Sequence, residues 1–438
     1  HSLAKILHTV WPFPTHLQPN IALGHALREL GHDVAFYTGA SVRSQLEAEG
    51  FACLPFRELN ESSVRLTVDQ LVNLRGNPRK KRDLWREFLV ATVPAQLRDL
   101  EVILNGFRAD AIVCDLAMWA PILVVGETRR LPVIAFSHVG NCLLPGPEGP
   151  LTGFALPHSR NLLVDLYGRA ASLIANAVAA PVRREASGIR IRHGLPPLSV
   201  TVTEFAGRMP LYLVPSAPEF DYLRKDLPAS VHYTGPCLWD RPKDHAPPDF
   251  VRKIDPARKC IVVDEGGLYR TEPKLFELAV EGLRNTPVQV VLIAGHGRDP
   301  EALNLGPLPP AMTLTRNTPL SDVLPVADLL LTNGNSNAVL AALSCGVPVV
   351  VLPSIWDQAE VAWRVHETGT GLRLAPRRCT PERLRSAVLR VLEQPSFREN
   401  AERMAVALRR PGGPARAAGL IEKLVTERGG EQAAEGIG

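Results

Sequence analysis

Two polar clusters follow neighbouring predicted strands in the stretch 329–358, LLLTNGNSNAVLAALSCGVPVVVLPSIWDQ. The apolar run 329–331 stops at the segment TNGNSN, and an apolar helical pattern follows at 337–343. In such a strand–loop–helix unit the loop offers unpaired backbone N–H groups at a helix N-terminus, where the helix dipole also favours negative charge. The first cluster therefore predicts a phosphate site.

The second cluster is Asp357 and Gln358, which come shortly after a buried strand at 347–352 and Pro353. Their side chains can accept and donate hydrogen bonds to sugar hydroxyls. Together the clusters suggest a phosphorylated sugar as the ligand. Each also has a simpler interpretation, because TNGNSN could be an ordinary polar turn and Asp357 a helix N-cap.

Length and composition predict two globular domains. A chain of 438 residues is too long to fold around one ordinary hydrophobic core, and a hydrophobic content of 45% is enough to fill two. The net charge of +4 is spread along the chain, which argues against nucleic-acid or membrane-surface binding. The basic run at 79–82 is interpreted as a solvated face, the alternative being contact with an anionic acceptor or partner protein.

The expected location is a reducing cytoplasm. Seven cysteines lie far apart, without paired metal-ligand spacing. There is no apolar stretch near 18 residues and no charged leader before an apolar segment, so we expect neither a spanning helix nor an intact signal peptide.

The first half alternates strand and helix patterns, as a parallel α/β fold does. Segment 57–82 is interpreted as polar and irregular, and the Gly- and Pro-rich segment 139–159 as an apolar-lined loop facing an acceptor. We predict strands at 3–10, 33–38, 51–56, 110–114, 133–136, 211–215 and 231–236, and helices at 18–30, 42–49, 83–107 (interrupted near Pro94) and 161–186.

The Pro- and charge-rich segment 239–250 has the composition of a linker, and a second α/β series follows it. A Pro-Gly break at 411–414 precedes the last helix, and the tail 429–438 is expected to be disordered. We predict strands at 259–263, 288–294, 312–315, 329–331 and 347–352, and helices at 273–284, 319–326, 337–343, 360–367, 381–393, 397–409 and 415–426.

Four features, spread over nearly the whole chain, carry a family resemblance. The segment THLQP (15–19), followed by GHDV (31–34), is similar to an opening in which a loop histidine precedes the first helix; Asp115 at a later strand end matches a partner carboxylate. GVPVVVLP (346–353) with Asp357 and Gln358 matches a donor-site signature, and the Pro-Gly break fits a chain that crosses back to its first domain. In these features the protein resembles the inverting, UDP-glycosyltransferase-like family 1 glycosyltransferases of bacterial natural-product type.

The resemblance implies the GT-B fold, an α/β architecture of two Rossmann-like domains facing a cleft, with a C-terminal helix crossing back to the first domain. The implied domains are an N-terminal acceptor-binding domain (1–236), a linker (237–250), a nucleotide-sugar-binding domain (251–410), the returning helix (411–428) and the tail (429–438).

The phosphate end departs from the family pattern. Where the family has His-Gly-Gly or His-Cys-Gly, this chain has Asn333, Gly334 and Asn335, and a usual phosphate-binding Ser or Thr is Ala338. Ser336, Asn337 and the loop N–H groups could substitute, although each is worth less than a charge-assisted bond.

The nucleotide end departs as well. The usual base-stacking aromatic residue corresponds to Asn317, before Pro319 and Leu320, and the Ser or Thr after the first strand of the second domain corresponds to Gly267, beside Gly266. The Glu that often binds the ribose hydroxyls corresponds to Ala341; because deoxyribose has no 2′-hydroxyl, this fits a dTDP-sugar at least as well as a UDP-sugar. His296, at another strand end, could reach nucleotide or phosphate, or be a solvated loop residue.

Inverting sugar transfer needs a base for the acceptor proton and a stabiliser for the departing diphosphate. Histidine is the residue type most often used as such a base, which points to His16, and Asp115 could hold its ring; the simpler interpretations are a packed loop histidine and a helix cap. The helix N-terminus after TNGNSN supplies fixed dipoles, so we expect no metal and no cofactor. The acceptor side is assigned to Trp11, Phe13, His138, Leu143 and Phe154.

The sequence thus predicts a glycosyltransferase that moves a sugar from a dTDP- or UDP-sugar to a hydroxyl or a carbon of a hydrophobic natural product, with no nucleic-acid partner and homodimerisation left open. Two alternatives remain at this point. A sugar-nucleotide epimerase on the same scaffold would need acid/base carboxylates near the sugar. A catalytically silent auxiliary protein would agree with the degenerate phosphate loop.

Overall fold

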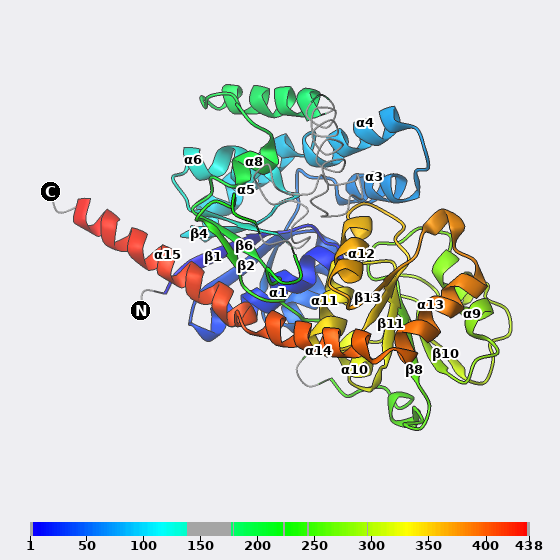
Figure 1. Cartoon of the computed structure of the whole chain (residues 1–438). Coiled ribbons are helices and arrows are strands. Elements are labelled where there is room, and N and C mark those ends of the chain that lie inside the picture. Colours follow the sequence, from blue (N-terminus) through cyan, green and yellow to red (C-terminus); the bar gives the residue numbers. More distant parts are fainter. Residues whose placement is uncertain are drawn as a thin grey trace.

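The computed structural model describes residues 3–137, 177, 179–221, 224–242, 245–295 and 297–435, with side chains to 428. Within these residues, seven parallel strands form a sheet in the order β3-β2-β1-β4-β5-β6-β7 (Figure 1). Its inner strands are buried along nearly their whole length, as in parallel sheets covered on both faces. The strands are β1 (Lys5–Thr9), β2 (Asp33–Thr38), β3 (Ala52–Pro55), β4 (Ala111–Asp115), β5 (Val133–Phe136), β6 (Leu211–Val214) and β7 (Val231–Tyr233).

Helices cover both faces of this first sheet. On one face, α1 and α2 contribute Leu17, Ile21 and Leu46 to the core; on the other, α3, α4 and α5 contribute apolar side chains such as Val68 and Leu100. The helices are α1 (Pro14–Glu29), α2 (Arg43–Ala48), α3 (Glu61–Asn73), α4 (Pro78–Leu89), α5 (Val93–Phe107), a π-helical turn (Pro121–Val125) leading into α6 (Gly126–Thr128), and α8 (Val202–Ala206).

The second half repeats the plan. Six described strands form a parallel sheet in the order β10-β9-β8-β11-β12-β13. They are β8 (Cys260–Asp264), β9 (Gln289–Ile293), β10 (Met312–Thr315), β11 (Leu329–Thr332), β12 (Val349–Val351) and β13 (Gly371–Arg373). The helices are α9 (Lys274–Leu283), α10 (Leu320–Val323), α11 (Ser336–Ser344), α12 (Gln358–Glu367), α13 (Pro381–Glu393), α14 (Pro395–Arg409) and α15 (Gly413–Glu435).

Both sheets follow the doubly wound order, in which the strand order reverses beside the first strand of each half. In such sheets ligands bind beyond the carboxyl ends of the strands at the reversal. The predicted architecture of two Rossmann-like domains is therefore confirmed, and β1–β4 and β8–β11 are where the site is to be sought.

Two predicted elements were wrong, and strand β13 and the short helix α8 were not predicted. Segment 57–82 is not irregular, because it holds α3 and the start of α4, each capped by an asparagine: Asn60 accepts from the Ser63 N–H and Asn77 from the Lys80 N–H. The single helix 83–107 is two helices, since Pro94 lies in the first turn of α5, where a missing N–H costs nothing. Most of the predicted helix 161–186 lies outside the described residues. Its described end is helical and belongs to a helical stretch at 179–192.

The last helix, α15, returns to the first domain, as predicted (Figure 1). Its Ala417, Ala418 and Ile421 are fully buried in the core that contains Ile21 of α1. The helix continues to Glu435 and so enters the stretch 429–438, where the sequence predicts a disordered tail.

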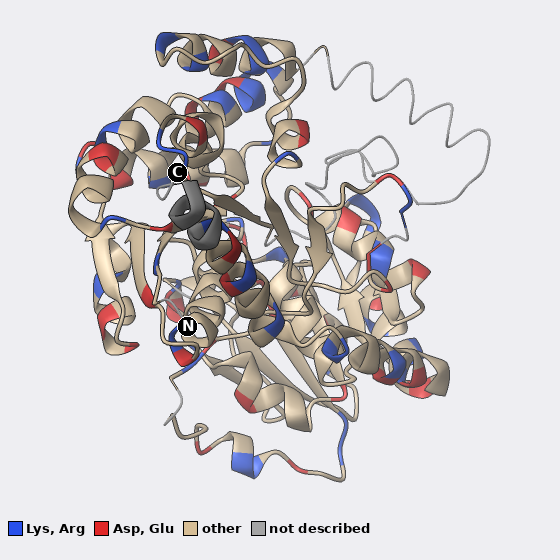
Figure 2. Cartoon of the chain, turned by 90° about the vertical axis from the view of Figure 1, so that its left-hand side faces the viewer, with Lys and Arg blue, Asp and Glu red and all other residues tan. Residues whose placement is uncertain are grey.

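Acidic and basic residues are interspersed over the ribbon in Figure 2, consistent with a small net charge. Within the described ranges, no helix is long and apolar enough to cross a membrane.

Candidate active site

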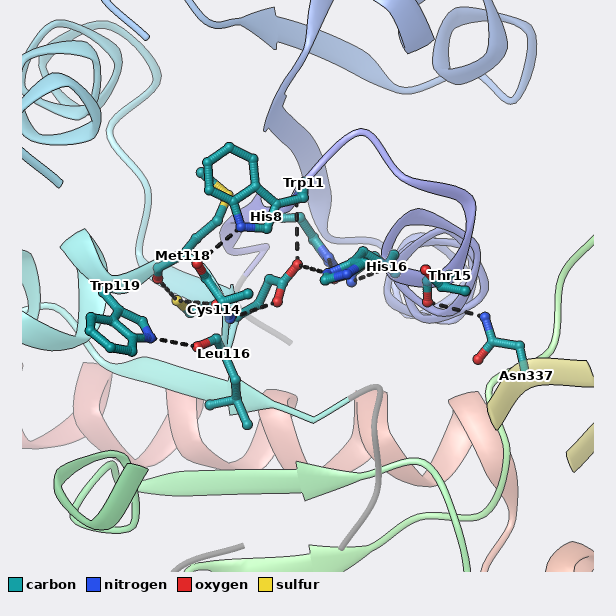
Figure 3. Close-up of polar contacts among 12 residues, drawn as sticks. His8, Trp11, Thr15, His16, Cys114, Leu116, Met118, Trp119 and Asn337 are labelled. Carbon is teal, nitrogen blue, oxygen red and sulfur yellow. Dashed lines mark hydrogen bonds and ion pairs between the residues drawn. The ribbon is translucent and has the colours of Figure 1, made fainter. Parts of the chain in front are cut away.

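His16 and Asp115 meet at the carboxyl edge of the first sheet. β1 leads directly into α1, whose first turn carries His16, and the neighbouring strand β4 ends at Asp115. His16 Nδ1 lies 2.6 Å from Asp115 Oδ2, and both side chains are buried (Figure 3). Such a contact fixes the ring orientation and, with the proton on Nδ1, directs Nε2 to act as the basic nitrogen.

Backbone N–H groups hold the carboxylate of Asp115 in place. Its Oδ1 accepts from the Ala117 N–H at 2.9 Å, and its Oδ2 also accepts from the Trp11 N–H at 3.4 Å. The Trp11 indole N–H in turn donates to the Ala117 carbonyl at 2.9 Å (Figure 3). The carboxylate therefore has a fixed position before any substrate arrives.

A second histidine close by, His8 on β1, has a different environment. It is fully buried, stacks on Phe36, and its Nδ1 lies 2.8 Å from Asn20 Oδ1. Burial lowers the pKa of His8 to about 4, so this ring is neutral at physiological pH. It is a core residue, so among the described histidines His16 is the one placed for acid–base chemistry at this edge.

At the predicted phosphate end, asparagine side chains shape the loop before α11. Asn335 caps the helix by accepting from the Ala338 N–H at 3.2 Å. Asn333 is buried, donates to the Glu265 carbonyl at 2.8 Å and accepts from the Asn335 N–H at 3.1 Å. Gly334 has φ +94°, a conformation that glycine adopts readily. Asn333 therefore takes a structural role at the position where a histidine would face the phosphate.

At the predicted sugar end, Gln358 shapes the loop that precedes α12. Its Oε1 accepts from the Ser354 and Ile355 N–H groups, both at 2.9 Å. The neighbouring Asp357 carboxylate accepts from the Ser336 hydroxyl at 3.3 Å, which ties the two clusters together. Burial raises the pKa of Asp357 to about 6.

A buried ion pair stiffens the loop after β8. Arg298 donates to Glu265 at 2.6 Å and to the Arg270 carbonyl at 2.5 Å, and its guanidinium lies 3.7 Å from the centroid of the Tyr269 ring. Burial raises the pKa of Glu265, although the adjacent guanidinium opposes this shift.

A cavity lies in the cleft between the two domains. Its walls include predicted donor residues, namely Gly266, Gly267, Asn317, Pro319, Leu320, Asn335 and Asn337. Asn333, Gly334, Ser336, Asp357 and Gln358 do not line this cavity, and instead form the hydrogen-bonded loops behind and beside it. The sequence missed several wall residues, among them Gln18, Gln45, Asp264 and the linker segment 237–240.

The assigned acceptor residues are only partly described. Trp11 is fully buried and packs on Phe88, while Phe13 is buried with its ring edge against His16. His138, Leu143 and Phe154 on the acceptor side, and His296 on the donor side, lie outside the described residues. The acceptor assignment therefore stays a prediction.

The two domains touch at the mouth of the cavity. Asn337 Nδ2 of α11 donates to the Thr15 carbonyl of α1 at 3.1 Å (Figure 3). Gly267 also faces Pro14 so closely that a Cβ at position 267 would lie 2.7 Å from Pro14 Cβ. The replacement of the family's Ser or Thr by Gly267 thus has a physical reason, because no side chain fits there in this closed arrangement.

We expect Gly267→Ala to disfavour this closed arrangement by about 1–3 kcal/mol, since the added methyl group overpacks the contact with Pro14. The measurement is the transfer rate with its donor KM, where a several-fold loss of kcat/KM is expected. Adding Pro14→Gly, which removes the Cβ together with the rest of the ring, should restore part of the activity. Gly106→Ala in α5 is the control, because no atom lies near its added methyl group. Equal behaviour of the two glycine variants would contradict the prediction.

We expect the free energy of unfolding to depend on pH because of Asp264, which lies at the end of β8. Burial raises its pKa from 3.8 to about 7, so the folded state retains a proton that the unfolded state loses above pH 4. Stability should therefore fall as pH rises from about 4 to 7 and stay level above. Asp264→Asn should remove this loss and raise the free energy of unfolding by about 2–4 kcal/mol at pH 8. Urea denaturation at pH 5 and pH 8 checks it; an advantage that is the same at both pH values would contradict it.

Within the described residues, no three His, Cys, Asp or Glu side chains are grouped so as to hold a metal ion.

Comparison with known proteins identifies the family. A family model described as the erythromycin biosynthesis protein CIII-like C-terminal domain matches residues 289–424. The 4'-demethylrebeccamycin synthase of Lentzea aerocolonigenes is 30% identical over 432 residues, covering 96% of this chain and 100% of that protein. The demethyllactenocin mycarosyltransferase of Streptomyces fradiae is 26% identical, covering 97% of this chain and 87% of its own.

Among solved structures, the glycosyltransferase VinC in complex with dTDP matches with a TM-score of 0.69 at 19% identity, covering 97% of this chain and 100% of that one. At 19% identity this similarity supports a shared fold and no more. Sequence and fold agree: the chain belongs to the family 1 glycosyltransferases of natural-product type, and it is a sugar-transferring enzyme with the GT-B fold.

Proposed function

We propose that the protein transfers a sugar, with inversion at the anomeric carbon, from a dTDP- or UDP-sugar to a hydrophobic natural-product acceptor. The observation that carries the proposal is the contact of 2.6 Å between His16 Nδ1 and Asp115 Oδ2 at the carboxyl edge of the first sheet. A buried histidine–carboxylate pair at a ligand-binding edge is the arrangement that general-base catalysis requires.

In the proposed reaction, His16 Nε2 takes the proton of an acceptor hydroxyl as its oxygen attacks the anomeric carbon. The bond from that carbon to the diphosphate breaks as the new bond forms, and a single displacement inverts the configuration. Asp115 stabilises the imidazolium that results, since its carboxylate lies against Nδ1.

The diphosphate leaves toward the second domain. There the α11 N-terminus, capped by Asn335, presents backbone N–H groups and a favourable dipole. The Asn337 amide lies beside the same cavity and links it to α1. We assign the sugar hydroxyls to Asp357 and Gln358, whose loop adjoins this end.

The choice of donor is the finer part of the proposal. Ala341 lines the cavity where a Glu would bind both ribose hydroxyls, which suits a deoxyribose. The similar structure of VinC was solved with dTDP, which supports testing dTDP-sugars first.

The test is to incubate the protein with dTDP- and UDP-sugars and a panel of polyketide, macrolide and aromatic aglycones. The panel includes the precursor used by the 4'-demethylrebeccamycin synthase. We expect a glycoside by mass spectrometry, with an inverted anomeric centre by NMR. No product with any pair, together with no change of Tm on adding either donor, would overturn the proposal; a retained configuration would overturn its inverting step.

A further inference from the structure

Among the described residues, one tryptophan stacks on no other aromatic ring or cation and makes no hydrogen bond. This residue is Trp239, and it is half-buried. The other five are engaged: Trp11 packs on Phe88, Trp85 packs on Trp356, Trp119 donates to the Leu116 carbonyl, and Trp363 lies under the Arg373 guanidinium. An aromatic ring that stacks on no other ring within the protein is free to stack on the ring of a ligand.

Trp239 lies in the wall of the interdomain cavity. It belongs to the linker segment 237–240, all of which lines that cavity. Its indole also packs against the core of the first domain, beside the buried Cys237. Trp239 thus has support from the core of the first domain and is at the same time one of the residues that line the cavity.

The linker is fastened to the nucleotide end of the cavity. The Asp240 carboxylate accepts from the Ser321 N–H at 2.8 Å and from the Ser321 hydroxyl at 2.6 Å, at the start of α10. Ser321 adjoins Pro319 and Leu320, which line the cavity together with Asn317. These bonds set Trp239 next to the segment that replaces the family's base-stacking residue.

That segment has no aromatic side chain to offer. Asn317 is exposed and polar, and Pro319 and Leu320 have no π face. We propose that Trp239 is the platform on which the donor's base stacks, supplied by the linker instead of by the second domain. This inference rests on the proposed binding of a nucleotide diphosphate sugar and adds the residue that holds its base.

A stacking platform is tolerant of base identity, because every base has a π face. Trp239 should therefore contribute equally to dTDP and UDP. Any discrimination between these donors would then come from the ribose end near Ala341 and not from the base.

The experiment measures dissociation constants of dTDP, UDP and inorganic pyrophosphate for the wild type, Trp239→Leu and Trp239→Phe by calorimetry. Trp239→Leu should bind dTDP and UDP about 5- to 100-fold more weakly, with pyrophosphate unchanged. Trp239→Phe should retain most of the affinity, because it keeps a ring. Trp363→Leu is the matched control, since Trp363 packs on Arg373 and does not line the cavity.

Kinetics add a second readout. In sugar transfer, Trp239→Leu should raise the donor KM and leave kcat at saturating donor nearly unchanged, because the stack is the same in ground and transition states. Unchanged dTDP and UDP affinities in Trp239→Leu would overturn the inference while the proposed function stands. An equal loss for pyrophosphate would also overturn it, since the variant would then have disturbed the whole cleft. A wild type that binds neither nucleotide would overturn the proposed function as well.

Discussion

His16→Ala is expected to lower kcat by about 10²- to 10⁴-fold, the range that a positioned general base contributes. The donor KM should change little, because His16 is not among the residues that line the cavity with the predicted donor residues. The measurement is steady-state glycoside formation at saturating donor and acceptor.

His25 provides a matched control on the same helix. Its Nε2 lies 2.8 Å from a carboxylate oxygen of Glu49, so it too forms a histidine–carboxylate pair, but on the side of α1 that packs on Phe51. His25→Ala should keep kcat within a few-fold of the wild type. If His16→Ala transfers sugar at the wild-type rate, His16 is not the base, although the family assignment stands.

Asp115→Asn is expected to lower kcat by about 10²-fold or more while the protein stays folded. An amide keeps an oxygen for the Ala117 N–H, but presents an N–H group toward His16 Nδ1. Nδ1 must then act as the acceptor, which places the ring proton on Nε2, the atom that should take the acceptor's proton. The variant also loses the charge that would stabilise the imidazolium.

The matched control for this variant is another buried carboxylate, Asp99 of α5. It accepts from the Tyr37 hydroxyl at 2.8 Å and from the Glu58 N–H at 2.8 Å, away from the cleft. Asp99→Asn should reduce Tm and leave kcat near its wild-type value. The prediction for Asp115 is contradicted if the two variants lose stability and activity in the same proportion.

Much of the fold was readable from local patterns. β2, β5, β10 and α13 have the predicted boundaries, since turn residues and proline mark their ends and continuous apolar runs mark the strands. The failure at 57–82 has a physical cause: α3 buries only a narrow stripe, including Val64, Val68 and Leu71, beneath an otherwise polar surface. The helical spacing and the Asn60 cap were present there, but net polarity concealed them.

Site residues could be predicted from the sequence where they directly follow a predicted strand. His16 and Asp115 were named from their places after two strands, and those strands are neighbours in the sheet. Contacts between residues distant in sequence were not readable. Pro14 facing Gly267, or the linker lining the cavity through Trp239, depends on how two domains meet, for which no local pattern exists.

Family membership also bears on the alternatives that the sequence left open. A sugar-transferring enzyme is neither a silent auxiliary protein nor an epimerase. Because the Asn333 amide donates to the Glu265 carbonyl, we expect the affinity for a donor diphosphate to come from other groups in the cleft.

The return of α15 has a consequence for building hybrid enzymes. Residues 417, 418 and 421 complete the core of the first domain, while Ala217 and Phe220, which precede β7, are buried in the core of the second. A hybrid made with a single junction in the linker would therefore place foreign side chains in both cores: those of α15 in the first core, and Ala217 and Phe220 in the second. Exchanging donor specificity between relatives calls for further junctions, one before residue 217 and one near Gly413, so that each core keeps side chains that evolved together.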